Sequence, residues 1–126
     1  MQAQPPKHFA VESQQYGDTV FLRLTGEFDL GAEEFFERTV DQLSREARSL
    51  VVDLSSLEFI DSSGLRALLR MWERSRADGF DVAVVPGAEQ VRHSMALTGM
   101  DRVLPVVTEV PAPNGASDGL AAPVVE

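Results

Sequence analysis

The chain has 126 residues, 44% hydrophobic and 25% charged, which are the proportions of one globular domain large enough to bury a core of its own. It contains no cysteine, which excludes disulfide scaffolds, thiol catalysis and cysteine-ligated metal sites. Its formal net charge is −9, so direct binding to nucleic acid or to an anionic membrane is not expected.

The two ends of the chain differ in composition from the middle. Residues 1–7 are expected to form a flexible leader, and residues 110–126, which are rich in proline and glycine, a disordered tail. No stretch has the apolar run of a signal peptide or a membrane span, so we expect a cytoplasmic protein. The folded domain is therefore expected over residues 8–109.

Between these ends, hydrophobic periodicity predicts strands and helices. Residues 9–12 and 20–25 are typical of an antiparallel hairpin, with Val20, Leu22 and Leu24 on one face of its second strand. The elements expected after the hairpin are a helix over 32–48 capped by Asp29, an apolar strand over 50–54, a helix over 63–77, a strand over 80–85, a helix over 87–97 and an edge strand over 103–107. The order β-β-α-β-α-β-α-β predicts an α/β fold with a mixed sheet covered by helices.

The segment Asp61-Ser62-Ser63-Gly64 stands where the second predicted helix of the domain begins. The first N–H groups of a helix have no intrahelical partner, so an Asp or Ser side chain there acts as a cap. The apolar pair at 59–60 is expected to anchor the loop from beneath and leave the polar side chains in water. Gly64 lacks a β-carbon and is expected to let another molecule approach the hydroxyls. The alternative is an ordinary helix cap.

Enzymatic chemistry finds little support in the sequence. Ser62 and Ser63 lack a G-x-S-x-G elbow, and the histidines, His8 and His93, are both expected on the surface. There is no phosphate-binding glycine loop, and no clustered ligand set suggests a metal or other cofactor. We therefore expect a protein that is not an enzyme.

Asp53 ends an apolar strand, as the phosphorylated aspartate of receiver domains does. That mechanism also needs a lysine on a later strand, and the single lysine is Lys7, so Asp53 is interpreted as a structural or loop-capping residue. What remains is a serine at a helix start, typical of a phosphorylation substrate or a binding module. Arg66, four residues after Ser62, can pair with a phosphate there; the interpretation we favour slightly is that Arg66, Arg70 and Arg74 form a solvated stripe.

Three segments together resemble a known family. In order they are Leu24-Thr25-Gly26-Glu27-Phe28-Asp29, Val51-Val52-Asp53-Leu54 and Phe59-Ile60-Asp61-Ser62-Ser63-Gly64-Leu65. Their order and spacing are similar to those of the STAS-domain anti-sigma-factor antagonists of bacteria, over about residues 8–107. The resemblance implies a STAS-like fold and a partner-switching regulator of stress-related transcription.

In that family the unmodified antagonist binds an anti-sigma factor that is also an ATP-dependent serine kinase, which frees the sigma factor. Phosphorylation of the antagonist breaks the complex, and a serine phosphatase resets it. The resemblance implies that Ser62 is the phosphoacceptor, with Ser63 as runner-up. The partner-binding residues that it implies are Gly26, Glu27, Asp29, Asp61, Ser63, Gly64 and Leu65.

Two alternatives stay open at the level of sequence. The chain could be a STAS-type scaffold, or a module that senses a ligand or nucleotide, and never cycles a phosphate.

Family members also commonly end with a helix after the last strand. Here either a shortened helix lies within residues 117–122 or that face of the sheet is covered differently.

Overall fold

The computed structural model describes residues 8–108, so the expectations for the leader, the tail and a last helix lie outside the described residues. The elements in order are β1 (Phe9–Tyr16), β2 (Thr19–Phe28), α1 (Leu30–Leu43), β3 (Ser49–Asp53), β4 (Leu57–Ile60), α2 (Ser62–Asp78), β5 (Asp81–Val85), α3 (Glu89–Thr98) and α4 (Met100–Val103). The predicted α/β class with a mixed sheet is confirmed.

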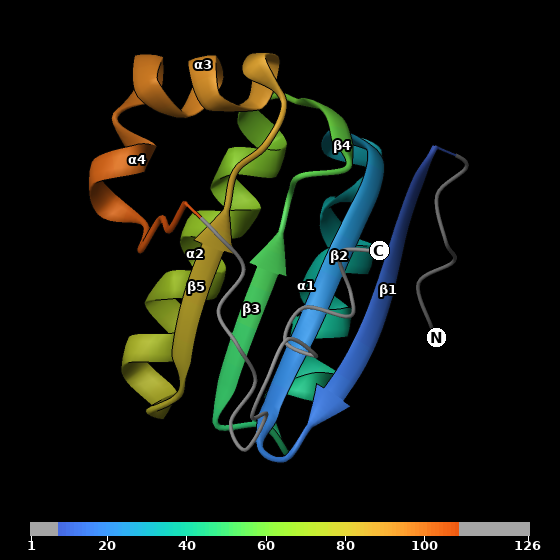
Figure 1. The fold of residues 1–126 in the computed structure, drawn as a ribbon, viewed down its shortest axis with the longest axis vertical. Coiled ribbons are helices and arrows are strands. Elements are labelled where there is room, and N and C mark those ends of the chain that lie inside the picture. Colours follow the sequence, from blue (N-terminus) through green and yellow to red (C-terminus); the bar gives the residue numbers. More distant parts are fainter. Residues whose placement is uncertain (1–7, 109–126) are drawn as a thin grey trace.

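The five strands form one sheet, in which β1, β2, β3 and β5 are neighbours in that order and β4 pairs with β2. β1 and β2 are the predicted antiparallel hairpin, and the other pairings are parallel. β4 pairs with β2 beyond the point where β3 ends. α1 and α2 lie side by side on one face of the sheet, and α3 crosses the end of the sheet near β4 (Figure 1). The carboxyl ends of β2 and β4 and the starts of both long helices therefore meet at one end of the molecule.

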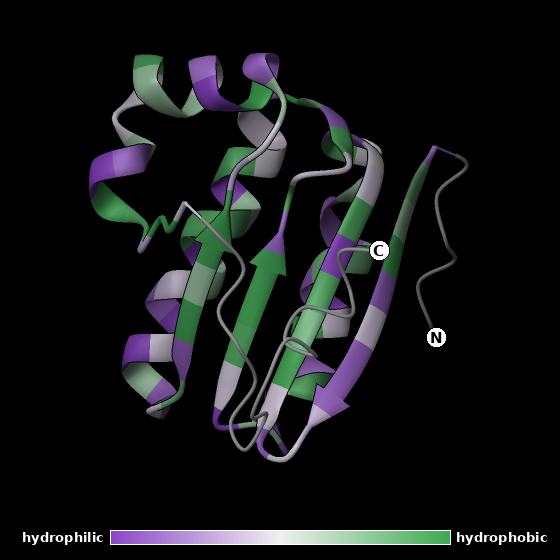
Figure 2. Cartoon of the chain, in the orientation of Figure 1, coloured by the Kyte–Doolittle hydropathy of each residue, from purple (hydrophilic) through white to green (hydrophobic). Residues whose placement is uncertain are grey.

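Alternation along the strands divides the apolar residues between two faces. Val20, Leu22 and Leu24 belong to the main core with the helices, as predicted, while Phe21 joins Val51 in a second cluster. The centre of the sheet is thus apolar on both faces, as expected for a central parallel strand. Figure 2 shows the hydrophobic colouring concentrated on β2, β3 and β5, whereas the edge strand β1 is largely hydrophilic. Polar side chains on an edge strand discourage pairing with other chains.

Two segments differ in type from the prediction, and the first helix ends at Leu43 rather than at residue 48. Residues 57–60 were expected in a loop but form β4, because a four-residue strand has too little pattern to stand out and its partner lies on β2. The predicted strand over 103–107 is wrong. The short helix α4 occupies its start, and only an isolated bridge between Val84 and Val106 remains. Pro105, which has no N–H to donate, limits a ladder there.

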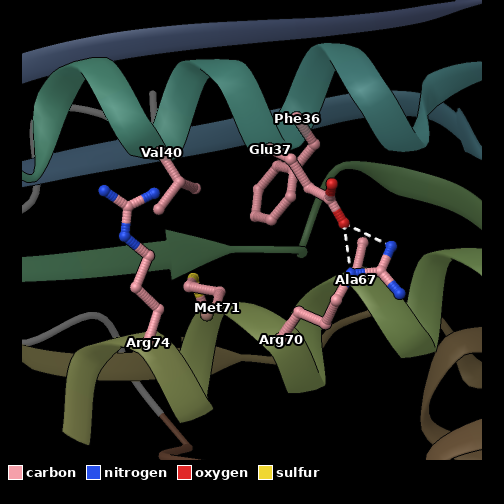
Figure 3. Close-up of a pocket in the computed structure, with 7 residues that line it drawn as sticks. All are labelled: Phe36, Glu37, Val40, Ala67, Arg70, Met71 and Arg74. Carbon is pink, nitrogen blue, oxygen red and sulfur yellow. Dashed lines mark hydrogen bonds and ion pairs between the residues drawn. The ribbon is translucent and has the colours of Figure 1, made fainter. Parts of the chain in front are cut away.

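Ion pairs connect α1 and α2 across the interface at which they pack. The residues involved are Arg66, Arg70 and Arg74 of α2 and Glu33, Glu37 and Asp41 of α1. Arg70 contacts both glutamates, and Arg74 Nη2 lies 2.5 Å from Asp41 Oδ1. The three arginines form the predicted stripe, with Arg66 and Arg70 exposed and Arg74 half-buried, but each also pairs with a carboxylate of α1. Figure 3 shows Arg70 reaching Glu37 across a groove whose floor is apolar, so the ion pairs close over the helix interface.

These contacts perturb two carboxyl groups. The pKa of Glu33 lies below its ordinary value, chiefly because Arg70 donates a hydrogen bond to the carboxylate. The pKa of Asp41 is lowered in the same way, chiefly by the hydrogen bond from Arg74. The contacts with the arginines therefore stabilise the charged form of each carboxyl group relative to its protonated form.

Acid is expected to weaken the domain through these carboxylates. A group whose folded pKa is depressed contributes stability above its unfolded pKa and loses it as the pH falls through the folded value. The free energy of unfolding, measured with urea from about pH 7 to about pH 3, should therefore fall, and fall less steeply in Glu33→Gln. Glu34→Gln, whose carboxylate pairs with Arg38 within α1, serves as the control. Equal slopes for Glu33→Gln and wild type would contradict the assignment.

Candidate functional site

Two strand-to-helix turns lie side by side at one end of the sheet. β2 leads into α1 through Asp29, and β4 leads into α2 through Asp61. The two strands run parallel with Phe28 opposite Ile60, so the two aspartates follow at matching positions. The Asp61 N–H also donates to the Phe28 carbonyl at 3.2 Å. The starts of α1 and α2 are therefore fixed next to each other (Figure 1).

Each aspartate caps its helix; the sequence predicted Asp29 in this role and left the choice between aspartate and serine open at the start of α2. Asp29 Oδ1 accepts a hydrogen bond from the Gly31 N–H at 3.1 Å. Asp61 Oδ1 accepts from the N–H groups of Ser63 and Gly64 at 2.8 and 3.2 Å. These bonds satisfy donors that the first turn leaves without intrahelical partners. The capping work at α2 is thus done by Asp61, which leaves the serines available for another role.

The two serines of the segment differ in exposure. Ser62 is the first residue of α2 and is exposed, whereas Ser63 is 8% exposed. The Ser63 hydroxyl also accepts a hydrogen bond of 3.5 Å from Arg66 Nη2. Of the two serines, Ser62 is therefore the one open to solvent, and the helix cap itself is supplied by Asp61.

Gly64 has a different role from the one predicted. A β-carbon at this position would lie 2.5 Å from the Phe28 carbonyl oxygen and 2.7 Å from Ile60 Cγ1. The missing β-carbon therefore lets α2 begin against the ends of β2 and β4, and does not make room for another molecule. Gly64 and Leu65 are both buried.

The two apolar residues before the cap, Phe59 and Ile60, differ in burial. Ile60 is buried as predicted, but Phe59 is 40% exposed, so the expectation that both anchor the loop is wrong for Phe59. A third residue does some of the anchoring. Gln90 of α3 accepts from the Ile60 N–H at 2.9 Å and donates to the Ile60 carbonyl at 3.0 Å. Sequence reasoning missed Gln90, because a lone glutamine thirty residues away carries no signal of this contact.

Acidic residues lie on the two strand-to-helix turns at this end of the sheet. Glu27 is exposed and stands opposite Phe59 in the strand register, and Asp29 and Asp61 are partly exposed. Gly26 has φ +91°, and a β-carbon there would lie 2.0 Å from the His8 carbonyl oxygen, so only glycine fits this close approach to β1. The site thus combines one reachable hydroxyl with a negatively charged border.

Asp53 lies outside this site. Its side chain is buried, and its Oδ1 accepts a hydrogen bond of 2.9 Å from the Ser55 N–H. This is the loop-capping role that the sequence predicted. Over residues 8–108, no three His, Asp or Glu side chains gather as ligands for a metal ion. In the same part of the chain, no helix has both the length and the apolar character needed to cross a membrane.

Comparison with known proteins agrees with this geometry. The STAS domain family model matches residues 10–112. The chain belongs to the STAS domain family. Over 98 aligned residues it is 24% identical to the anti-sigma F factor antagonist of Paenibacillus polymyxa. The aligned region covers 76% of this chain and 84% of that relative.

Solved structures share the STAS fold. An anti-sigma factor antagonist from Mycobacterium paratuberculosis superposes with a TM-score of 0.75 and 24% identity, covering 83% of this chain and 90% of that one. The Bacillus cell fate determinant SpoIIAA, in its phosphorylated form, gives a TM-score of 0.61 and 21% identity, covering 79% and 93%. At these identities the structural likeness concerns the fold.

Gly64→Ala is expected to destabilise this STAS domain by about 2 kcal/mol or more, because the added methyl group meets a backbone carbonyl that cannot give way easily. Gly31→Ala is the matched control, since it occupies the first turn of α1 and its β-carbon would meet only Asp29 Oδ1 at 3.5 Å. Its free energy of unfolding should stay equal or rise by about 0.5–1 kcal/mol. Urea unfolding measures both, and similar effects of the two substitutions would contradict the packing role of Gly64.

Proposed function

We propose that this STAS domain is an anti-sigma factor antagonist that binds an anti-sigma factor with serine kinase activity and is released when Ser62 is phosphorylated. The observation that carries the proposal is the exposed residue Ser62 at the start of α2, next to a buried Ser63. Supporting it, one relative is named an anti-sigma F factor antagonist and one similar structure is a phosphorylated form.

In the proposed reaction, the Ser62 hydroxyl oxygen attacks the γ-phosphorus of ATP. A new phosphorus–oxygen bond forms, the bond to the ADP leaving group breaks, and the hydroxyl proton passes to a base of the kinase. The domain tolerates the product for two reasons. Asp61 keeps capping α2, since the cap does not use the Ser62 side chain. The positive end of the helix dipole also favours a negative group at this position.

The same modification is expected to eject the bound partner. A phosphate adds about 1.5 to 2 negative charges to a surface that already carries Glu27, Asp29 and Asp61. A partner surface shaped for a neutral hydroxyl would then have to bury an uncompensated charge, which costs more than the contact gains. We place the partner's polar contacts at these three carboxylates, with the shape of the surface set by Gly26, Ser63, Gly64 and Leu65.

The proposed cycle needs a second enzyme and no cofactor of the domain itself. A serine phosphatase returns Ser62 to the hydroxyl form, and the domain then binds the kinase again and frees the sigma factor. The domain acts on transcription through protein partners, in the cytoplasm, without contacting nucleic acid. Its net charge of −9 agrees with a role that avoids the DNA backbone.

Incubation with the anti-sigma factor kinase and ATP, followed by intact-protein and peptide mass spectrometry, tests the site. Wild type and Ser63→Ala should each gain one phosphate, on the peptide that contains residue 62, and Ser62→Ala should gain none. Ser63→Ala is the matched control because it removes the neighbouring hydroxyl. Phosphorylation of Ser62→Ala to the wild-type extent would refute Ser62 as the acceptor.

Release of the partner is tested separately by titrating the anti-sigma factor into unmodified variants. Ser62→Asp is expected to weaken binding at least about tenfold, because it places one negative charge where the hydroxyl was. Ser13→Asp, at an exposed position of β1, makes the same charge change away from the start of α2 and should bind like wild type. Equal affinities for Ser62→Asp and Ser13→Asp would argue against the charge-based release.

A further inference from the structure

The three arginines between α1 and α2 are not held equally. Arg70 and Arg74 each contact two acidic side chains. Arg66 instead shares Glu33 with Arg70, at 3.5 Å from its Nε to Glu33 Oε2, and its side chain is 52% exposed. If Arg66 moves away, Glu33 keeps its contact with Arg70. Arg66 is therefore the arginine that can change partner at the smallest cost.

Arg66 also lies within reach of the proposed phosphorylation site. Its Nη2 donates to Ser63 Oγ at 3.5 Å, so the guanidinium is folded back over the first turn of α2. Ser62 and Arg66 are four residues apart in one helix, which places their side chains on the same side of the helix as neighbours. An acidic group four residues before a basic one is the favourable order for such a pair.

We propose that Arg66 is the positioning residue for phosphorylated Ser62. When the phosphate is present, the Arg66 guanidinium leaves Glu33 and pairs with the phosphate, while Arg70 keeps Glu33. The inference rests on the proposed modification of Ser62. A phosphoserine carries about 1.5 to 2 negative charges and accepts paired hydrogen bonds from a guanidinium, so it competes successfully with a single shared carboxylate. The exchange changes ion-pair partners and breaks no covalent bond.

Other charged groups face the same position. Asp61 caps α2, Asp29 caps α1 and Glu27 lies near the end of β2, and all three disfavour the doubly charged form of a phosphate on Ser62. Glu33, across the helix interface, acts in the same direction, and the Gln90 side chain that α3 brings to Ile60 is neutral. Arg66 opposes the carboxylates. The second pKa of the phosphate therefore reports directly on whether Arg66 has moved to it.

The experiment uses the full chain with phosphoserine incorporated at residue 62 during translation, so that no kinase is needed. Phosphorus NMR titration gives the second pKa of the phosphate for otherwise wild-type protein, Arg66→Gln and Arg76→Gln. Arg76 is the matched control. It lies on the same helix over the ring of Trp72, fourteen residues from Ser62 or about 21 Å along the axis, which exceeds the Debye length of about 8 Å in physiological salt.

Arg66→Gln is expected to raise the second pKa of the phosphate by about 0.5, and Arg76→Gln to change it by less than about 0.1. Equal second pKa values for otherwise wild-type protein and Arg66→Gln would overturn the inference. Equal rises in both variants would overturn it as well, because net charge alone would then explain them. A kinase that fails to modify Ser62 contradicts the proposed function without altering this comparison. If the kinase does modify Ser62 but the second pKa of the phosphate is the same with and without Arg66, only the inference about Arg66 is contradicted.

Discussion

The parallel pairing of Phe28 with Ile60 is the constraint on which the rest of the site depends. It brings two strand-to-helix turns into register, and the hydrogen bond from the Asp61 N–H to the Phe28 carbonyl ties them together. The absence of a side chain at Gly64 lets α2 begin directly against this pair. Ser62 is therefore exposed at a position that the backbone fixes.

The charges of the domain divide into two groups with different tasks. Between α1 and α2, arginines and carboxylates pair across the helix interface and stabilise the packing. Around Ser62, the side chains of Glu27, Asp29 and Asp61 are only partly covered and give the end of the sheet a negative border. A phosphate added there is expected to meet like charges at the surface, while Arg70 and Arg74 keep their ion pairs across the helix interface. Arg66 stands where the two groups meet.

Local sequence signals anticipated much of this arrangement. Both aspartate caps, the hairpin, the faces of β2 and the start of α2 follow from propensities that act within a few residues. Several of the missed features are contacts between distant segments. β4 is defined by its partner on β2, Gln90 by its bonds to Ile60, and the role of Gly64 by the carbonyl of Phe28. A glycine beside a serine suggests access to the hydroxyl, and only the fold shows that it serves packing.

The central claim is that Ser62 can carry a phosphate while the fold stays unchanged. Amide hydrogen exchange, compared residue by residue between the unmodified chain and the chain with phosphoserine at 62, tests it most directly. The account predicts that differences are confined to the two turns and the first turns of α1 and α2, with unaltered protection in β2, β3 and β5. Loss of protection throughout the sheet in the phosphorylated chain would contradict it.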